Sequence, residues 1–301
     1  MKIAILDSGY DFSQTLRNKI ILNLNFTKES SKDENGHGTC ITKLIDSIGS
    51  DIEIYILKIL GRNCKGKLQF LKDALLEAIH CDVNILNLSL GIETFIVDHE
   101  LQKILEDCLS KGMIIVTSES NSGKTNYLSQ NDQVVSIQGK FKNLNTNKNI
   151  ICMNNSPRIL PWLESSYILS GANSFLTPFV IKCIYELFKY NVFDKYSFSF
   201  DILKKYFMQQ HYILNTNHSP QRAVVKNTLL MSVIMPQITA LNLYDHSNTL
   251  QITNASPQRI TSLVRIIENA THHPYIYNSF WLHDLIYMEN LINKIDTITE
   301  K

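Results

Sequence analysis

The order of apolar segments in about the first 140 residues limits the fold of this chain more than any other feature of its sequence. Short apolar runs predict β-strands at residues 3–6, 52–60, 85–90, 113–116 and 134–137. Apolar residues spaced three or four apart predict helices at residues 39–48, 68–80 and 99–111. Strands that alternate with helices form a mostly parallel sheet covered on both faces. We therefore expect a three-layer α/β fold whose ligands bind at the carboxyl ends of the strands.

The pattern changes after residue 194, so we expect a domain at 1–194 and a small α+β domain of unknown function at 195–301. Helices are predicted at 196–210, from Ser256-Pro257 onward and at 280–295, and a polar loop at 215–221. Residues 227–234 and 240–252 are interpreted as strands or buried segments, the second with a turn at 245–248.

The composition excludes several classes of protein. Of the 301 residues, 44% are hydrophobic, which is too many for a disordered chain. The 29 basic and 28 acidic residues nearly balance, which argues against general binding to nucleic acids or to anionic membranes. The longest apolar stretch, residues 159–188, is interrupted by polar and charged side chains and is not expected to span a membrane.

The start of the chain and its cysteines indicate the compartment. Met1-Lys2 is followed by only four apolar residues, too few for the core of a signal peptide, so we expect a cytoplasmic protein. The six cysteines occur singly, without the spacing of a metal site, and are expected to be reduced thiols. No acidic loop typical of calcium binding is present, so the sequence predicts neither a metal nor a cofactor.

Four short stretches carry residues suited to acyl transfer. Asp7 ends the first predicted strand, and His37 lies between two glycines at the start of a predicted helix. Asn121 follows a later strand, and Ser174 precedes a predicted helix that has Pro178 in its first turn. A serine becomes an effective nucleophile beside a base, and a histidine can take up and return a proton near neutral pH. A carboxylate orients the imidazole, while an asparagine amide can stabilise the oxyanion.

Each stretch alone is weak, but together and in this order they resemble the subtilase family, the subtilisin-like serine peptidases. The family motifs D-[ST]-G, G-H-G-T-H, G-N and G-T-S-M-A-x-P match here around Asp7, His37, Asn121 and Ser174. The resemblance extends from residue 1 to about residue 190. It implies that Asp7, His37 and Ser174 form a catalytic triad and that Asn121 stabilises the oxyanion.

The resemblance also implies where a peptide binds. Asn87-Leu88-Ser89-Leu90-Gly91 is similar to the family strand N-[ML]-S-[LF]-G, so Ser89, Leu90 and Gly91 are expected to pair with the substrate backbone. Ser118, Glu119 and Ser120 are expected to form the opposite wall of the pocket for the residue before the scissile bond.

The chain departs from the family pattern at several positions. Cys40 stands where the His motif has its second histidine, and Ser120 replaces the glycine before Asn121. Ala172 and Asn173 replace Gly-Thr before Ser174, and Phe175 and Leu176 replace Met-Ala after it. Because alanine lacks the conformational freedom of glycine, the turn before Ser174 is expected to differ from the family turn.

The function predicted from the sequence is that of an intracellular serine endopeptidase that cuts a restricted peptide or precursor. Two alternatives remain open at this point. The same fold could bind peptides without turnover, or it could transfer the acyl group to an amine, as a transpeptidase or macrocyclase does. All three functions require a peptide or protein partner and no nucleic acid.

Overall fold

The computed structural model describes residues 1–92, 98–122, 124, 126–139, 149–153, 157–194, 196–211, 228–251, 254–273, 276–280 and 282–299. Contacts between residues divide the chain into two compact units. The first unit comprises Met1–Asn155 and Ala172–Asn215, and the second comprises Ser156–Gly171 and Thr216–Lys301. The division differs from the expected boundary at 194, because a segment just before Ser174 belongs to the second unit.

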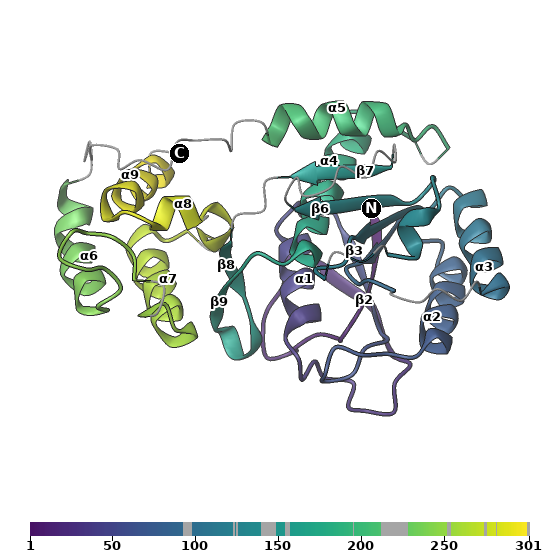
Figure 1. Ribbon diagram of the computed structural model, residues 1–301, viewed down its shortest axis with the longest axis horizontal. Helices are drawn as coiled ribbons and strands as arrows, with labels where there is room; N and C mark the ends of the chain where they lie inside the picture. The colour runs from purple at the N-terminus through teal and green to yellow at the C-terminus, as the bar shows by residue number, and fades with distance from the viewer. Residues whose placement is uncertain are drawn as a thin grey trace. The chain divides into compact units, whose positions relative to one another are not determined.

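The first unit is built on a parallel sheet of seven strands in the order β2-β3-β1-β4-β5-β6-β7 (Figure 1). The strands are β1 (Lys2–Asp7), β2 (Lys19–Asn25), β3 (Glu53–Lys58), β4 (Ile85–Leu88), β5 (Ile114–Ser118), β6 (Val135–Gly139) and β7 (Ile150–Met153). The central strands are buried almost throughout, as expected for a sheet covered on both faces. The predicted α/β fold is therefore confirmed.

Helices cover both faces of this sheet. Alternate strand residues such as Ala4, Leu6 and Leu57 pack against α2 (Leu68–His80) and α3 (His99–Ser110). The opposite face is covered by α1 (His37–Asp46) and α4 (Thr177–Lys189), which contact β1 and β5. Helix α5 (Phe200–His211) packs on α4 (Figure 1). The layers predicted from the sequence are those observed.

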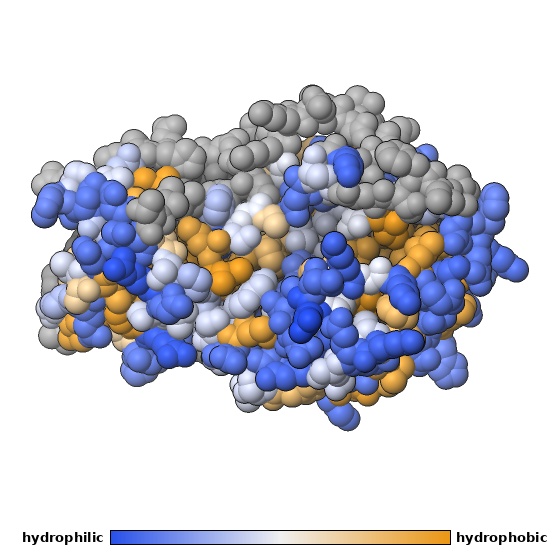
Figure 2. All heavy atoms as spheres, turned by 60° about the horizontal axis from the view of Figure 1, so that its bottom comes forward, coloured by the Kyte–Doolittle hydropathy of each residue, from blue (hydrophilic) through white to orange (hydrophobic). Residues whose placement is uncertain are grey.

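Helix α3 shows how the apolar pattern orients a helix. Its side chains at Leu101, Ile104, Leu105 and Cys108 are buried, and its remaining surface is mostly hydrophilic (Figure 2). The carboxylate of Asp98 accepts a hydrogen bond of 2.8 Å from the backbone N–H of Leu101 and so caps the helix. The buried stripe fixes which side of α3 faces the sheet.

The second unit consists of a hairpin and several helices. Strands β8 (Arg158–Pro161) and β9 (Tyr167–Ser170) pair antiparallel, and β9 packs against α7 (Pro257–Thr271). The other helices are α6 (Thr228–Ala240), α8 (Leu282–Leu285) and α9 (Met288–Thr299). Short 3-10 helices occur in this unit at Leu163–Ser165 and Ile276–Ser279, and in the first unit at Leu128–Gln130 and Asn173–Leu176. As predicted, α7 begins after Ser256, whose side chain accepts a hydrogen bond from the N–H of Arg259.

Four sequence predictions in this region need correction or fall outside the described residues. The sequence predicts a strand or a buried segment at 227–234, and a strand is wrong there because residues 228–240 form α6. A short apolar run without a clear period does not distinguish a strand from a buried helix. At 240–251 the structure has isolated antiparallel bridges between Tyr244 and Leu250 and between Thr249 and Tyr287. The expected helix at 280–295 is divided into α8 and α9. The loop expected at 215–221 lies outside the described residues.

Candidate active site

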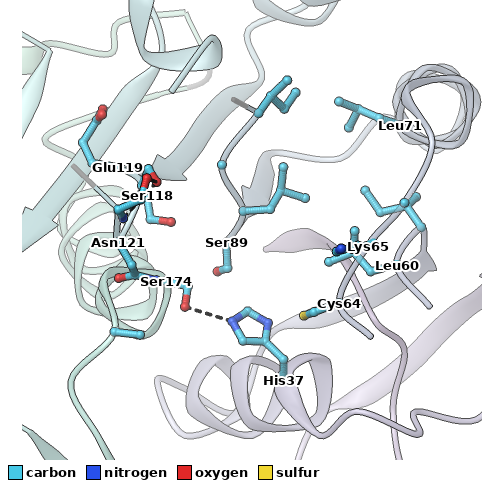
Figure 3. A pocket seen from close by; sticks show the side chains of 18 of the residues that line it. His37, Leu60, Cys64, Lys65, Leu71, Ser89, Ser118, Glu119, Asn121 and Ser174 are labelled. Atoms are coloured by element: carbon cyan, nitrogen blue, oxygen red, sulfur yellow. Dashed lines mark hydrogen bonds between the residues drawn. The ribbon is translucent and has the colours of Figure 1, made fainter. Parts of the chain in front are cut away.

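Three side chains far apart in the sequence form a hydrogen-bonded series at the carboxyl edge of the sheet. Asp7 ends β1, His37 begins α1, and Ser174 lies in the 3-10 turn before α4. His37 Nδ1 lies 2.8 and 2.9 Å from the two carboxylate oxygens of Asp7. On the other side of the ring, His37 Nε2 lies 2.9 Å from Ser174 Oγ (Figure 3). Because the ionised carboxylate only accepts, Nδ1 donates to Asp7 and Nε2 accepts from the Ser174 hydroxyl.

Two glycines allow His37 to approach Asp7. Gly36 precedes α1 with a φ of 99°, a conformation that residues with a Cβ rarely adopt. A Cβ on Gly38 would lie 2.3 Å from the backbone oxygen of Gly9, so only glycine permits this contact between α1 and the end of β1. The N–H of Gly38 donates to Ser8 Oγ at 2.9 Å, which joins the two segments directly.

A buried carboxylate that the sequence analysis missed holds the start of α1. Asp33 is 1% exposed, and its Oδ1 accepts hydrogen bonds of 2.9 Å from the N–H groups of Asn35 and Gly36. Its Oδ2 accepts from the N–H and the hydroxyl of Thr39, at 2.8 and 2.7 Å. Asp33 thereby binds N–H groups that the first turn of a helix leaves without an intrahelical partner.

The environment of His37 affects its protonation. Burial lowers the pKa of His37, but the charge of Asp7, the hydrogen bond to Asp7 and the charge of Asp33 together raise the pKa above the ordinary histidine value. The ring of Phe175 packs against the imidazole, with 5.0 Å between centroids. The residue after Ser174, which is bulkier than the methionine of the family motif, therefore contacts the imidazole directly.

Asn121 lies where the turn after β5 meets the loop that carries Ser174. Its side-chain oxygen accepts a 2.8 Å hydrogen bond from the N–H of Asn173. This contact leaves the amide nitrogen of Asn121 as the end that can donate to an oxyanion. Asn173 in turn donates from its side chain to the backbone oxygen of Glu119 at 3.2 Å and accepts from the N–H of Gly139 at 2.9 Å. The substitution of threonine by Asn173 thus adds links between the serine loop and the sheet.

The residues expected to bind the substrate surround a cavity of about 910 Å³ that opens beside His37 and Ser174 (Figure 3). Residues of both expected walls line it: Ser89, Leu90, Gly91, Ser118, Glu119 and Ser120. The hydroxyl of Ser89 is 2.6 Å from that of Thr177, so this side chain links β4 to α4 rather than pointing freely at a ligand. The carboxylate of Glu119 is buried and accepts a 2.6 Å hydrogen bond from Ser136.

The cavity continues away from Ser174 along the first turns of α2. Apolar side chains line this part, namely Leu60, Leu68, Leu71 and Ile92. Cys64 and Lys65 lie between it and His37 (Figure 3). Such a shape, with polar groups at one end and an apolar recess at the other, suits an extended peptide with an apolar side chain.

The described residues show neither a candidate metal centre nor a candidate membrane span. No group of three or more His, Cys, Asp or Glu side chains there is arranged to hold a metal ion. Nor does that part of the chain contain a helix long and apolar enough to cross a membrane.

A Ser–His–Asp series at the edge of a parallel sheet has the arrangement found in serine hydrolases. The family model described as "Subtilase family" matches residues 1–156, just over half of the chain. The chain therefore belongs to the subtilase family, as the motifs predicted.

Individual relatives are similar to parts of the chain. Minor extracellular protease Epr of Bacillus subtilis is 30% identical over 153 residues, which cover 46% of this chain and 23% of that protein. Subtilisin BL of Lederbergia lenta is 26% identical over 132 residues, which cover 41% of this chain and 48% of that protein. An intracellular serine protease of Paenibacillus polymyxa is 25% identical over 139 residues, covering 41% of this chain and 42% of that protein. The chain thus spans half or less of the length of these relatives.

Among solved structures, a mutant of the protease domain of PatA resembles the chain with a TM-score of 0.53. The match covers 64% of this chain and 81% of that domain, at 16% sequence identity. This likeness concerns the fold, and it supports the three-layer architecture described above.

Proposed function

We propose that this protein is a serine endopeptidase. The single observation that supports the proposal most is the hydrogen-bonded series Asp7–His37–Ser174 beside a cavity large enough for several peptide residues. Subtilase relatives whose names describe proteases add support. The activity follows from the chemistry of the series, because a serine next to a neutral, oriented imidazole is an activated nucleophile.

Each residue has a defined role in the proposed reaction. Ser174 Oγ attacks the carbonyl carbon of the peptide while His37 Nε2 takes up the hydroxyl proton. Asp7 keeps the proton of the neutral imidazole on Nδ1 and stabilises the imidazolium that forms. Asn121 donates to the oxyanion. His37 then gives its proton to the departing amine, and water hydrolyses the acyl-enzyme by the same route.

We also propose that the enzyme acts inside the cell on a restricted peptide, such as a precursor. All six cysteines are free thiols, as expected in a reducing compartment, and one relative is named an intracellular serine protease. The second unit contains none of Asp7, His37, Asn121 and Ser174. It is therefore available for another task, and recognition of the precursor is the one we propose.

The proposal is tested with a fluorophosphonate probe and a peptide library, using Ser174→Ala as the matched control. We expect the probe to label the wild-type protein and the library to be cut. The variant is expected to show no labelling, because the attacking hydroxyl is absent, and to lose roughly six orders of magnitude in kcat on peptides. Casein is expected to be cut far more slowly than the best peptide. Labelling and cleavage that persist in Ser174→Ala would refute the mechanism.

A further inference from the structure

Where β4 and β5 end, their continuations separate and become the two walls of one pocket. The walls are residues 89–91 on one side and 118–120 on the other, and both lie beside Ser174 (Figure 3). We call the space between them the primary pocket. Its width and depth decide which side chain of a peptide can enter next to the nucleophile.

The side chain of Asn126 bridges the two walls of the primary pocket where they begin to separate. Its amide nitrogen lies 3.2 Å from the backbone oxygen of Leu90 in one wall and 2.8 Å from that of Ser118 in the other. One nitrogen atom therefore lies within hydrogen-bond distance of both walls, between Leu90 and Ser118. The same nitrogen lies 3.0 Å from the hydroxyl of Thr117, at the last residue pair that β4 and β5 share.

Asn126 is fixed in this position. It is fully buried, and its side-chain oxygen accepts hydrogen bonds from the N–H groups of Ile92 at 3.0 Å and Leu128 at 3.2 Å. Its own N–H points to the carboxylate of Glu119 at 3.4 Å. If the carboxamide moved aside for a large substrate side chain, the backbone oxygens of Leu90 and Ser118 would both lose this donor, which is unfavourable.

The walls are also close together near their outer ends. A Cβ placed on Gly91 would lie 3.8 Å from both Cα and Cβ of Ser120, which is van der Waals contact. A single carbon atom on Gly91 would therefore fill the space between the walls at this level. Ser120, which replaces the family glycine, adds bulk to one wall at this level.

From these contacts we infer that the enzyme accepts only a small side chain, that of Gly, Ala or Ser, before the scissile bond, and that Asn126 sets this limit. The inference rests on the proposed function and specifies its substrate class. Asn126 limits the depth of the primary pocket and Ser120 limits its width. Binding energy for the rest of the peptide then comes from other parts of the cavity.

The test measures kcat/KM for peptides that differ only in the residue before the scissile bond, namely Gly, Ala, Ser, Leu or Phe. The wild-type protein is expected to prefer Ala over Phe by about 100-fold, the discrimination that a filled pocket provides against a larger side chain. Asn126→Ala and, separately, Ser120→Gly are expected to reduce this ratio at least about tenfold. A wild-type protein that cuts Phe or Leu peptides as fast as Ala peptides would overturn the inference.

Asn149→Ala is the matched control for the loss of a buried amide. Asn149 is also fully buried, and its amide nitrogen donates to three backbone oxygens, those of Ser129, Asn131 and Val134. Its side chain bonds to neither wall of the primary pocket, so its variant is expected to lose stability without changing the Ala-to-Phe ratio. Equal changes of the ratio in both variants would show that loosened packing, not the shape of the primary pocket, sets the preference.

The outcome also separates this inference from the proposed function. Failure of the fluorophosphonate probe together with failure of every peptide would refute the proteolytic activity itself. Labelling of Ser174 with preference for large side chains would leave the activity intact and refute only the role of Asn126.

Discussion

Replacing Asp33 by asparagine is expected to have two effects. It weakens the start of α1, and it changes the pH dependence of the reaction. Asparagine keeps one oxygen acceptor but cannot accept at both positions, so two of the four hydrogen bonds described above are lost. At about 1.5 kcal/mol for a hydrogen bond to a charged group, the free energy of unfolding falls by about 3 kcal/mol. For a unit of this size the melting temperature then falls by roughly 6–12 °C.

The second effect concerns His37. The charge of Asp33 contributes to the raised pKa of His37, so its removal lowers that pKa. His37 must be neutral to accept the proton of Ser174, and kcat/KM therefore rises with pH as the imidazole deprotonates. In Asp33→Asn this rise is expected at lower pH than in the wild-type protein.

The assay is the pH profile of kcat/KM, or of the rate of fluorophosphonate labelling where turnover is slow. Asp46→Asn is the matched control, because Asp46 is also fully buried and accepts from the N–H groups of Arg17 and Asn18. It ends α1, roughly 13 Å along the helix axis from His37. We expect it to reduce stability without shifting the profile. If both variants shift the profile alike, or neither does, the electrostatic reasoning is wrong.

Three further predictions follow from the site. Asn121→Ala is expected to lower kcat by about 10²–10³-fold with little change in KM, as steady-state kinetics would show; a change in KM alone would contradict the oxyanion role. Asp7→Asn is expected to reduce the free energy of unfolding more at pH 5.5 than at pH 9, measured by urea denaturation. The reason is that the raised pKa of His37 stabilises the fold at low pH, and this contribution disappears as the pH rises through that pKa; an equal loss at both pH values would argue against the ion pair. Ser89→Ala is expected to cost about 1 kcal/mol of stability, because its hydroxyl bonds within the protein, while a large rise in KM without destabilisation would show that it binds substrate instead.

Local sequence patterns were sufficient for the layers of the first unit. Helix α2 begins and ends at the predicted residues, because its apolar positions repeat at the helical period over its whole length. The same approach failed at 228–240, where an almost continuous apolar run has no distinguishing period. It also missed β8 and β9, which pair with each other and, through β9, pack on α7, a helix distant in the sequence.

By itself, the sequence determined which residue types stand at strand ends and helix starts: Asp7, His37, Asn121 and Ser174 are set by local motifs. Only the tertiary structure decided that a hydroxyl and an imidazole separated by 137 positions lie 2.9 Å apart. It also revealed Asp33 and Asn126, whose importance comes from backbone groups that they bind and not from a motif. The physical reason is that backbone N–H and C=O groups are the same at every residue, so the sequence does not mark which of them a buried side chain must satisfy.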